Sequence, residues 1–212
     1  MTFAVVLQTL ATAFARPLPG PAAQAALAPA PRRGWPAGHQ GAKIRHAAGL
    51  LLLFPVDERP HVLLTVRAGT LGRHGGQVSL PGGVIEPGET PEEAALREAH
   101  EEVALPLEAV RVLGALTPLD IPVSGFRLHP VVASHATRPI LTAAHGEVAR
   151  ILEVAVDDLL NPALLGPAAR ERDGAPIMVP AFHVGGEEIW GATAMVLAEF
   201  LALLGWSIRL SE

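Results

Sequence analysis

The sequence predicts an α/β or α+β sandwich in which strands surround a few helices and one acidic helix packs against the central sheet. Two apolar runs, Ala47–Phe54 and His61–Arg67, have the length and composition of buried strands. The stretch from Thr90 to about Ala104 has the capping residues and apolar spacing of a helix. Strand-like and helical segments then follow one another as far as residue 204.

An N-terminal extension over residues 1–41 is expected to precede a domain over residues 42–212. Apolar side chains recur there at helical spacing, at Phe3, Val6, Leu7, Leu10 and Phe14. We interpret them as an amphipathic helix that packs on the domain or on a partner subunit, so a homodimer is possible. A signal peptide is the less favoured reading, because the stretch lacks a basic n-region. Residues 16–41, rich in Pro, Ala and Gly, predict a linker with a short helix near 22–27.

The other elements are expected in a regular order after the first two strands. Further strands are predicted at 77–80, 108–116, 127–137, 147–156, 177–184 and 188–190, with loops at 81–83 and 118–125. A short helical segment is predicted at 157–160 and a closing helix at 191–204. The closing helix is apolar almost all round, which burial in the core or a subunit interface would explain.

Composition excludes several classes of function. A net charge of −5 offers no electrostatic footprint for nucleic acid or an anionic membrane. The chain has no cysteine, which excludes disulfides, thiolate catalysis and zinc–cysteine sites. No apolar run approaches the roughly 20 residues of a membrane span, and no P-loop or Rossmann motif occurs. We therefore expect a cytoplasmic protein with no nucleic-acid or membrane partner.

The acidic helix begins with clear local signals. A tight turn is predicted at Glu86-Pro87-Gly88-Glu89, with Pro and Gly at the positions that favour them. Thr90 and Glu93 then form a capping box, and Pro91 stands where a missing N–H does no harm.

Three carboxylates, those of Glu98, Glu101 and Glu102, fall within one turn on one face of this helix. Their mutual repulsion would be relieved by a hard divalent cation such as Mg²⁺ or Mn²⁺, which prefers carboxylate oxygens. A solvated acidic face is the alternative for such a helix, but the preceding Pro81-Gly82-Gly83 loop and the spacing argue against it.

The small side chains of Ala94 and Ala95 are expected one turn earlier on the same side, where they would leave room for a ligand. Arg97 lies four residues before Glu101 and is expected to pair with it. The opposite, core-facing side is expected to carry Leu96, Ala99 and Val103.

The spacing of the whole stretch resembles the Nudix box, the signature of hydrolases that cleave a nucleoside diphosphate linked to another moiety. It reads Gly83, five residues, Glu89, seven residues, then Arg97-Glu98-Ala99-x-Glu101-Glu102-x-Ala104-Leu105, with Ala104 where the family usually has glycine. The resemblance implies an α/β/α sandwich with a mixed sheet. It also implies a metal-binding backbone carbonyl at Gly83.

Candidate roles follow for each residue of the site. Glu98 and Glu102 are the leading metal ligands, and Glu101 adds a third carboxylate or an outer contact. Arg97 is expected to orient Glu101, with direct phosphate contact as the lesser alternative. The general base is Glu101, Glu102 or Glu147, and Glu147 could equally be a surface residue that begins a strand.

Residues upstream of the box resemble the extra motif of the coenzyme A pyrophosphatase subfamily. The matching positions are 63–68, Leu71, His74, 76–79 and 81–83, and further likeness lies at 146–148 and 189–194. Gly72 stands where that motif often has arginine, with Arg73 adjacent, and Leu80 replaces the usual phenylalanine. Arg67 and Arg73 are candidate phosphate contacts, and a plain cation at a strand end is the alternative for Arg67.

The resemblance implies hydrolysis of the diphosphate of coenzyme A or its derivatives, with Mg²⁺ or Mn²⁺ as cofactor. The products would be 4′-phosphopantetheine and adenosine 3′,5′-bisphosphate. Two alternatives stay open at this point: a Nudix hydrolase for another diphosphate, such as ADP-ribose or NADH, and a non-catalytic module that binds a nucleotide or a protein partner.

Overall fold

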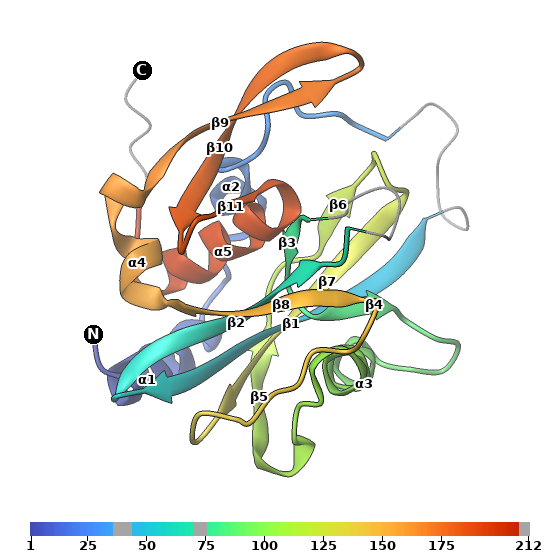
Figure 1. Ribbon diagram of the computed structural model, residues 1–212. Coiled ribbons are helices and arrows are strands. Elements are labelled where there is room, and N and C mark those ends of the chain that lie inside the picture. The colour runs from blue at the N-terminus through green and yellow to red at the C-terminus, as the bar shows by residue number, and fades with distance from the viewer. Residues whose placement is uncertain (36–43, 70–75, 208–212) are drawn as a thin grey trace.

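The computed structural model describes residues 1–35, 44–69 and 76–207 (Figure 1). An eight-stranded mixed sheet has the central order β3-β2-β1-β7-β5, with β4 paired to β1, β6 to β7 and β8 to β2. Its strands are β1 (Arg45–Val56), β2 (Arg59–Arg67), β3 (Val78–Ser79), β4 (Gly82–Val84), β5 (Val110–Ala115), β6 (Leu119–Ile121), β7 (Phe126–His135) and β8 (Val148–Ala155). A three-stranded antiparallel sheet adds β9 (Leu165–Arg172), β10 (Ala175–Val184) and β11 (Glu187–Trp190).

Helices cover both faces of the large sheet, which confirms the predicted α/β class. They are α1 (Phe3–Phe14), α2 (Gly20–Ala25), α3 (Pro91–Val103), α4 (Val156–Leu160) and α5 (Gly191–Leu203), and two short 3₁₀ turns lie at Leu107–Ala109 and Pro162–Leu164. Alternate residues of β1 serve the two sides, since Leu50 and Leu52 pack with α3 while Leu51 and Leu53 pack in the core that contains α5. Burial on both faces explains why the first strand is a continuous apolar run.

Three strands lie where the sequence did not predict them. β6 occupies part of the expected loop 118–125 by pairing with β7, and β4 occupies part of the expected loop 81–83 by pairing with β1. The third, β9, carries Pro167 and several charged residues, which are uncommon in strands. Its two-residue turn to β10 is Asp173-Gly174, with φ of 54° and 77°. An Asp-Gly pair between strands is a strong hairpin signal, so β9 could have been predicted.

The described part of the N-terminal segment is held on the domain. Val6 and Leu10 of α1 are fully buried in the core that contains α5. Glu199 of α5, also fully buried, accepts hydrogen bonds from Gly20 N at 3.1 Å, Gln24 Nε2 at 2.8 Å and Thr117 Oγ1 at 2.6 Å. This carboxylate therefore joins α2 to the loop before β6. The domain boundary near residue 41 and the homodimer stay predictions.

None of the helices in the described part of the chain combines the length and the apolar character that a membrane span needs.

Ala104 ends α3 in the left-handed conformation, with φ 53° and ψ 38°. Its N–H donates to the carbonyl of His100 at 2.9 Å. Cβ makes this conformation unfavourable by about 1–2 kcal/mol, and the larger unfolded-state entropy of glycine offsets part of that difference. We expect Ala104→Gly to raise the free energy of unfolding by about 1 kcal/mol, measured by urea denaturation.

Ala11→Gly is the matched control for this substitution, because Ala11 is exposed in the interior of α1. It should lower the free energy of unfolding by about 1 kcal/mol. If both variants were destabilised equally, the left-handed conformation of Ala104 would carry no strain.

Candidate active site

The site is built on α3, which begins with a tight turn and a capped N-terminus. Gly88 has a φ of 94°, which the turn requires. Glu93 N donates to Thr90 Oγ1 at 3.2 Å, while the Glu93 carboxylate accepts from Thr90 N at 2.8 Å. Both halves of the predicted capping box are thus present, and they fix where the helix begins.

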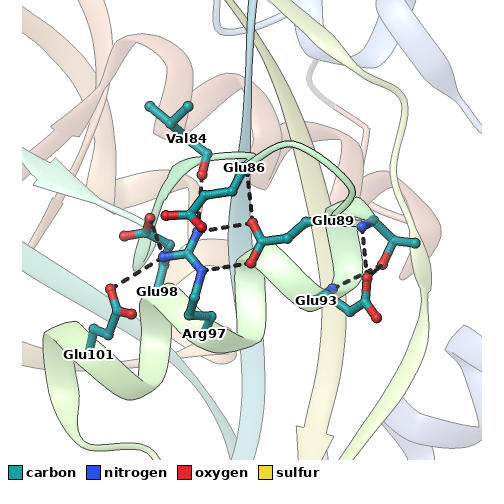
Figure 2. Close-up of polar contacts among 8 residues, drawn as sticks. Val84, Glu86, Glu89, Glu93, Arg97, Glu98 and Glu101 are labelled. Carbon is teal, nitrogen blue, oxygen red and sulfur yellow. Dashed lines mark hydrogen bonds and ion pairs between the residues drawn. The ribbon is translucent and has the colours of Figure 1, made fainter.

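Arg97 is the centre of a network that ties this turn to the helix (Figure 2). Its guanidinium forms two bonds to the Glu89 carboxylate, Nε–Oε1 at 2.7 Å and Nη2–Oε2 at 3.1 Å. Nη1 donates to Glu98 at 2.9 Å and to Glu101 at 3.3 Å, and Nη2 also donates to the carbonyl of Val84 at 3.1 Å. The hydrogen bonds to Arg97 hold the pKa of Glu89 below its usual value.

The pair between Arg97 and Glu101 is therefore present, but it is one of several. Glu89 appears in the box spacing, yet sequence reasoning assigned it no role. The structure makes it the bidentate partner of Arg97, an arrangement that gives both strength and direction. The signal was available, since Glu89 directly precedes Thr90, the N-cap residue of the helix that carries Arg97.

A pocket of about 500 Å³ lies between α3, β4 and the ends of β2 and β8. It brings together Arg67, Gly83, Glu98, Glu102 and Glu147, all of which were predicted as site residues. Arg97 and Glu101 are not among its lining residues, but Arg97 bonds to two that are, Glu98 and the carbonyl of Val84. Arg73 lies outside the described residues.

Glu102 is the most buried carboxylate of the pocket, with 7% of the residue exposed. Gly82 N donates to it at 3.3 Å, and Arg67 Nη1 lies 3.9 Å from its Oε1. Burial raises the pKa of Glu102 to about 7; the bond from Gly82 and the charge of Arg67 oppose this, while Glu98 and Glu147 add to it. In this buried position, the ionised form of Glu102 would be stabilised by a nearby cation.

The three helix carboxylates are not equivalent. Side-chain exposure is 56% for Glu101, 19% for Glu98 and 9% for Glu102. The prediction that Ala94 and Ala95 leave room above these carboxylates was wrong. Both are fully buried in the core beneath α3, together with Ala99 and Val103. Such small side chains allow the helix backbone to lie close to the sheet, and Glu102 shares this inward face.

Backbone and carboxylate approach each other closely at Gly83. A Cβ at this position would overlap the carboxylate of Glu98, and one at Gly82 would overlap the carbonyl of Ala48 on β1. Glycine at position 82 therefore permits the pairing of β4 with β1, and glycine at position 83 permits the contact with Glu98.

The residues of the pocket fit a divalent cation. Within the described ranges, no three Asp, Glu, His or Cys side chains form a ready-made metal cluster. The pocket nevertheless offers the carboxylates of Glu98, Glu102 and Glu147 together with the backbone at Gly83. These are hard oxygen donors, the type that Mg²⁺ and Mn²⁺ prefer. A bound cation would also favour the charged form of Glu102, whose pKa is raised mainly by burial and further by the charges of Glu98 and Glu147.

Comparisons with known proteins agree with this geometry. Residues 43–172 match the NUDIX domain family. The chain is 38% identical over 157 residues to an uncharacterized Nudix hydrolase NudL of Cronobacter sakazakii, covering 73% of this chain and 81% of the relative. It is 35% identical over 162 residues to a protein of the same name from an Enterobacter strain, covering 76% and 84%.

Solved structures support the same fold. A Nudix hydrolase from M. smegmatis, RenU, superposes with a TM-score of 0.57 at 24% identity, covering 85% of this chain and all of that chain. A MutT protein from Methanosarcina mazei superposes with a TM-score of 0.51 at 15% identity, covering 78% and 97%. From the family match and the curated relatives, the chain belongs to the Nudix hydrolase family, whose members act on nucleoside diphosphate derivatives.

Proposed function

We propose that this Nudix hydrolase cleaves the diphosphate of coenzyme A or its derivatives, with Mg²⁺ or Mn²⁺ as cofactor. The products are 4′-phosphopantetheine and adenosine 3′,5′-bisphosphate. The observation that most directly supports coenzyme A as the substrate is where the motif upstream of the Nudix box leads in the structure. Its β2 segment ends at Arg67, which lines the same pocket as Glu98, Glu102 and Glu147. Arg67, the proposed phosphate contact, thus lies beside the carboxylates.

Diphosphates resist attack by water because their oxygens carry negative charge. When bound, divalent metal ions neutralise that charge and lower the pKa of a coordinated water. Glu98, Glu102 and the carbonyl of Gly83 would hold the metal, and Arg67 binds a phosphate oxygen. Water attacks one phosphorus, the bond from that phosphorus to the bridging oxygen breaks, and the other phosphate leaves with that oxygen.

The attacking water must lose a proton to a base. Glu147 is the proposed base, because it lines the pocket from a different segment and leaves Glu98 and Glu102 for the metal. Glu102 is the alternative. Arg97 and Glu101 are positioning residues in this scheme, since Arg97 bonds to Glu98 and is held by Glu89 and Glu101.

One substrate panel tests the proposal. The full chain is incubated with coenzyme A, acetyl-coenzyme A, ADP-ribose and NADH, each with Mg²⁺, with Mn²⁺ or with EDTA, and the products are identified by mass. We expect 4′-phosphopantetheine from coenzyme A and no cleavage in EDTA. Cleavage of ADP-ribose or NADH while coenzyme A survives would identify the alternative hydrolase. Binding without any cleavage would identify a non-catalytic module. The cytoplasmic location stays a prediction.

A further inference from the structure

The three-stranded sheet has two faces of different character. Directly opposed residues of antiparallel strands share a face. Phe182 and Ile189 oppose each other and are fully buried in the main core. The other face carries four partly or fully exposed side chains that can bind or stack, those of Arg170, His183, Glu188 and Trp190.

A small buried cluster supports Trp190 on this face. Ala168, Val179 and Ala181 form it, and Trp190 packs against it. The guanidinium of Arg170 lies 4.6 Å from the centre of the Trp190 ring. Arg170 Nη1 is 2.7 Å from Glu188 Oε2, and His183 Nδ1 is 3.8 Å from Glu188 Oε1. The Trp190 ring is therefore held in place, with the polar side chains of Arg170, Glu188 and His183 near it.

A pocket of about 620 Å³ opens against this face. Its lining residues are Gly76, Gln77, Arg170, His183, Gly186, Glu187, Glu188 and Trp190. Among these, Trp190 is the one large apolar side chain, so the described lining does not suit an aliphatic ligand. The charges are also paired: Arg170 with Glu188, and Glu187 with Arg150 of β8. A flat, neutral ring with polar edges matches this chemistry better than a second phosphate does.

The pocket lies next to the active site. The first link between them is a pair of backbone hydrogen bonds. Arg67 N donates to the carbonyl of Gln77 at 3.0 Å, and Gly76 N donates to the carbonyl of Arg67 at 2.9 Å. Arg67 lines the catalytic pocket, whereas Gly76 and Gln77 line this one. Glu147 and Arg150 make a second link, because Glu147 lines the catalytic pocket and Arg150 pairs with Glu187.

We propose that this second pocket binds the purine base of the substrate's nucleotide arm. The base packs against Trp190 and the Arg170 guanidinium that lies over its ring, and its polar edge meets Glu188 and His183. The inference rests on the proposed function in so far as the base is the adenine of coenzyme A.

Binding of the two product halves tests the pocket without catalysis. Calorimetry on the full chain in EDTA uses adenosine 3′,5′-bisphosphate and, separately, 4′-phosphopantetheine as probes. Trp190→Leu should weaken adenosine 3′,5′-bisphosphate binding by about tenfold, the scale of one base stack. It should leave 4′-phosphopantetheine unaffected. Trp190→Phe keeps an aromatic face and should bind within about threefold of wild type, a rescue that a merely misfolded site would not give.

Trp35→Phe is the control, because Trp35 bonds to Asp120 and lies outside the pocket. It should leave both affinities unchanged. Weakened 4′-phosphopantetheine binding in Trp190→Leu would show that the pocket holds the other arm. Unchanged affinity for both probes would show that it holds neither, and each result overturns the inference.

Kinetics separate this inference from the proposed function. If coenzyme A is cleaved, Trp190→Leu should raise KM about tenfold and leave kcat nearly unchanged, because base stacking is the same in ground and transition states. Cleavage of coenzyme A with an unaltered KM in Trp190→Leu would refute the base pocket alone. Tryptophan-dependent nucleotide binding without coenzyme A cleavage would refute the proposed substrate alone.

Discussion

Glu102→Gln is expected to lower kcat by about 10²–10⁴-fold while the protein stays folded. Glutamine keeps the size of the side chain and can still accept from Gly82 N, which lies 3.3 Å from Glu102 Oε2. It removes the negative charge that would hold a metal ion or accept a proton in the pocket. The measurement is the initial rate with saturating substrate and Mg²⁺, alongside circular dichroism to verify the fold.

Glu101→Gln is the matched control, because it makes the same change one residue earlier on the same helix. The Glu101 side chain is 56% exposed and contacts Arg97, so we expect a loss of at most about tenfold. Full activity in Glu102→Gln, or an equal loss in both variants, would contradict the role assigned to Glu102.

Glu102→Gln should also stabilise the metal-free protein at neutral and alkaline pH. The pKa of Glu102 is raised to about 7 by burial, above its ordinary value of 4.5. Between these two pH values the folded state keeps a proton that the unfolded state releases, so wild-type stability falls as pH rises. At about 1.4 kcal/mol for each pH unit, the cost reaches about 3 kcal/mol above pH 7.

Urea denaturation of both proteins in EDTA, from pH 4 to pH 8, measures this difference. The two curves should agree near pH 4 and diverge as pH rises, with Glu102→Gln the more stable. Saturating Mg²⁺ should stabilise wild type more than the variant. A constant difference at all pH values would mean that Glu102 titrates normally.

Arg97→Lys is expected to lower kcat/KM by about 10–100-fold, the usual cost of losing a residue that orients a metal ligand. The planar guanidinium bonds at once to Glu89, Glu98, Glu101 and the carbonyl of Val84 (Figure 2). An ammonium keeps the charge but cannot span these partners. Glu98 should then lose its fixed direction, and half-maximal activity should need a higher metal concentration.

Activity as a function of Mg²⁺ concentration measures this effect. Arg111→Lys is a suitable control, since Arg111 is exposed on β5 at a distance in sequence from the pocket's lining residues. It should leave both kcat/KM and the metal requirement unchanged. An Arg97→Lys enzyme with the metal requirement of wild type would show that Arg97 does not act through Glu98.

Local spacing determined much of this protein from its sequence alone. The capping box at Thr90 and Glu93, the helix that follows and the pair of Arg97 with Glu101 depend on residues within a few positions of one another. The apolar strands β1 and β2 likewise follow from short runs with no competing pattern. For such features, helix and strand geometry is sufficient.

Only the tertiary structure decided which groups meet across the fold. Helical spacing alone placed Ala94 and Ala95 beside a ligand, whereas packing on β1 buries them. The approach of Arg67 and Glu147 to Glu102 depends on β2 pairing with β8. The pocket at Trp190 needs β9, β10 and β11 to share one face. These contacts join residues far apart in the chain, and burial, not spacing, sets the charge state of Glu102.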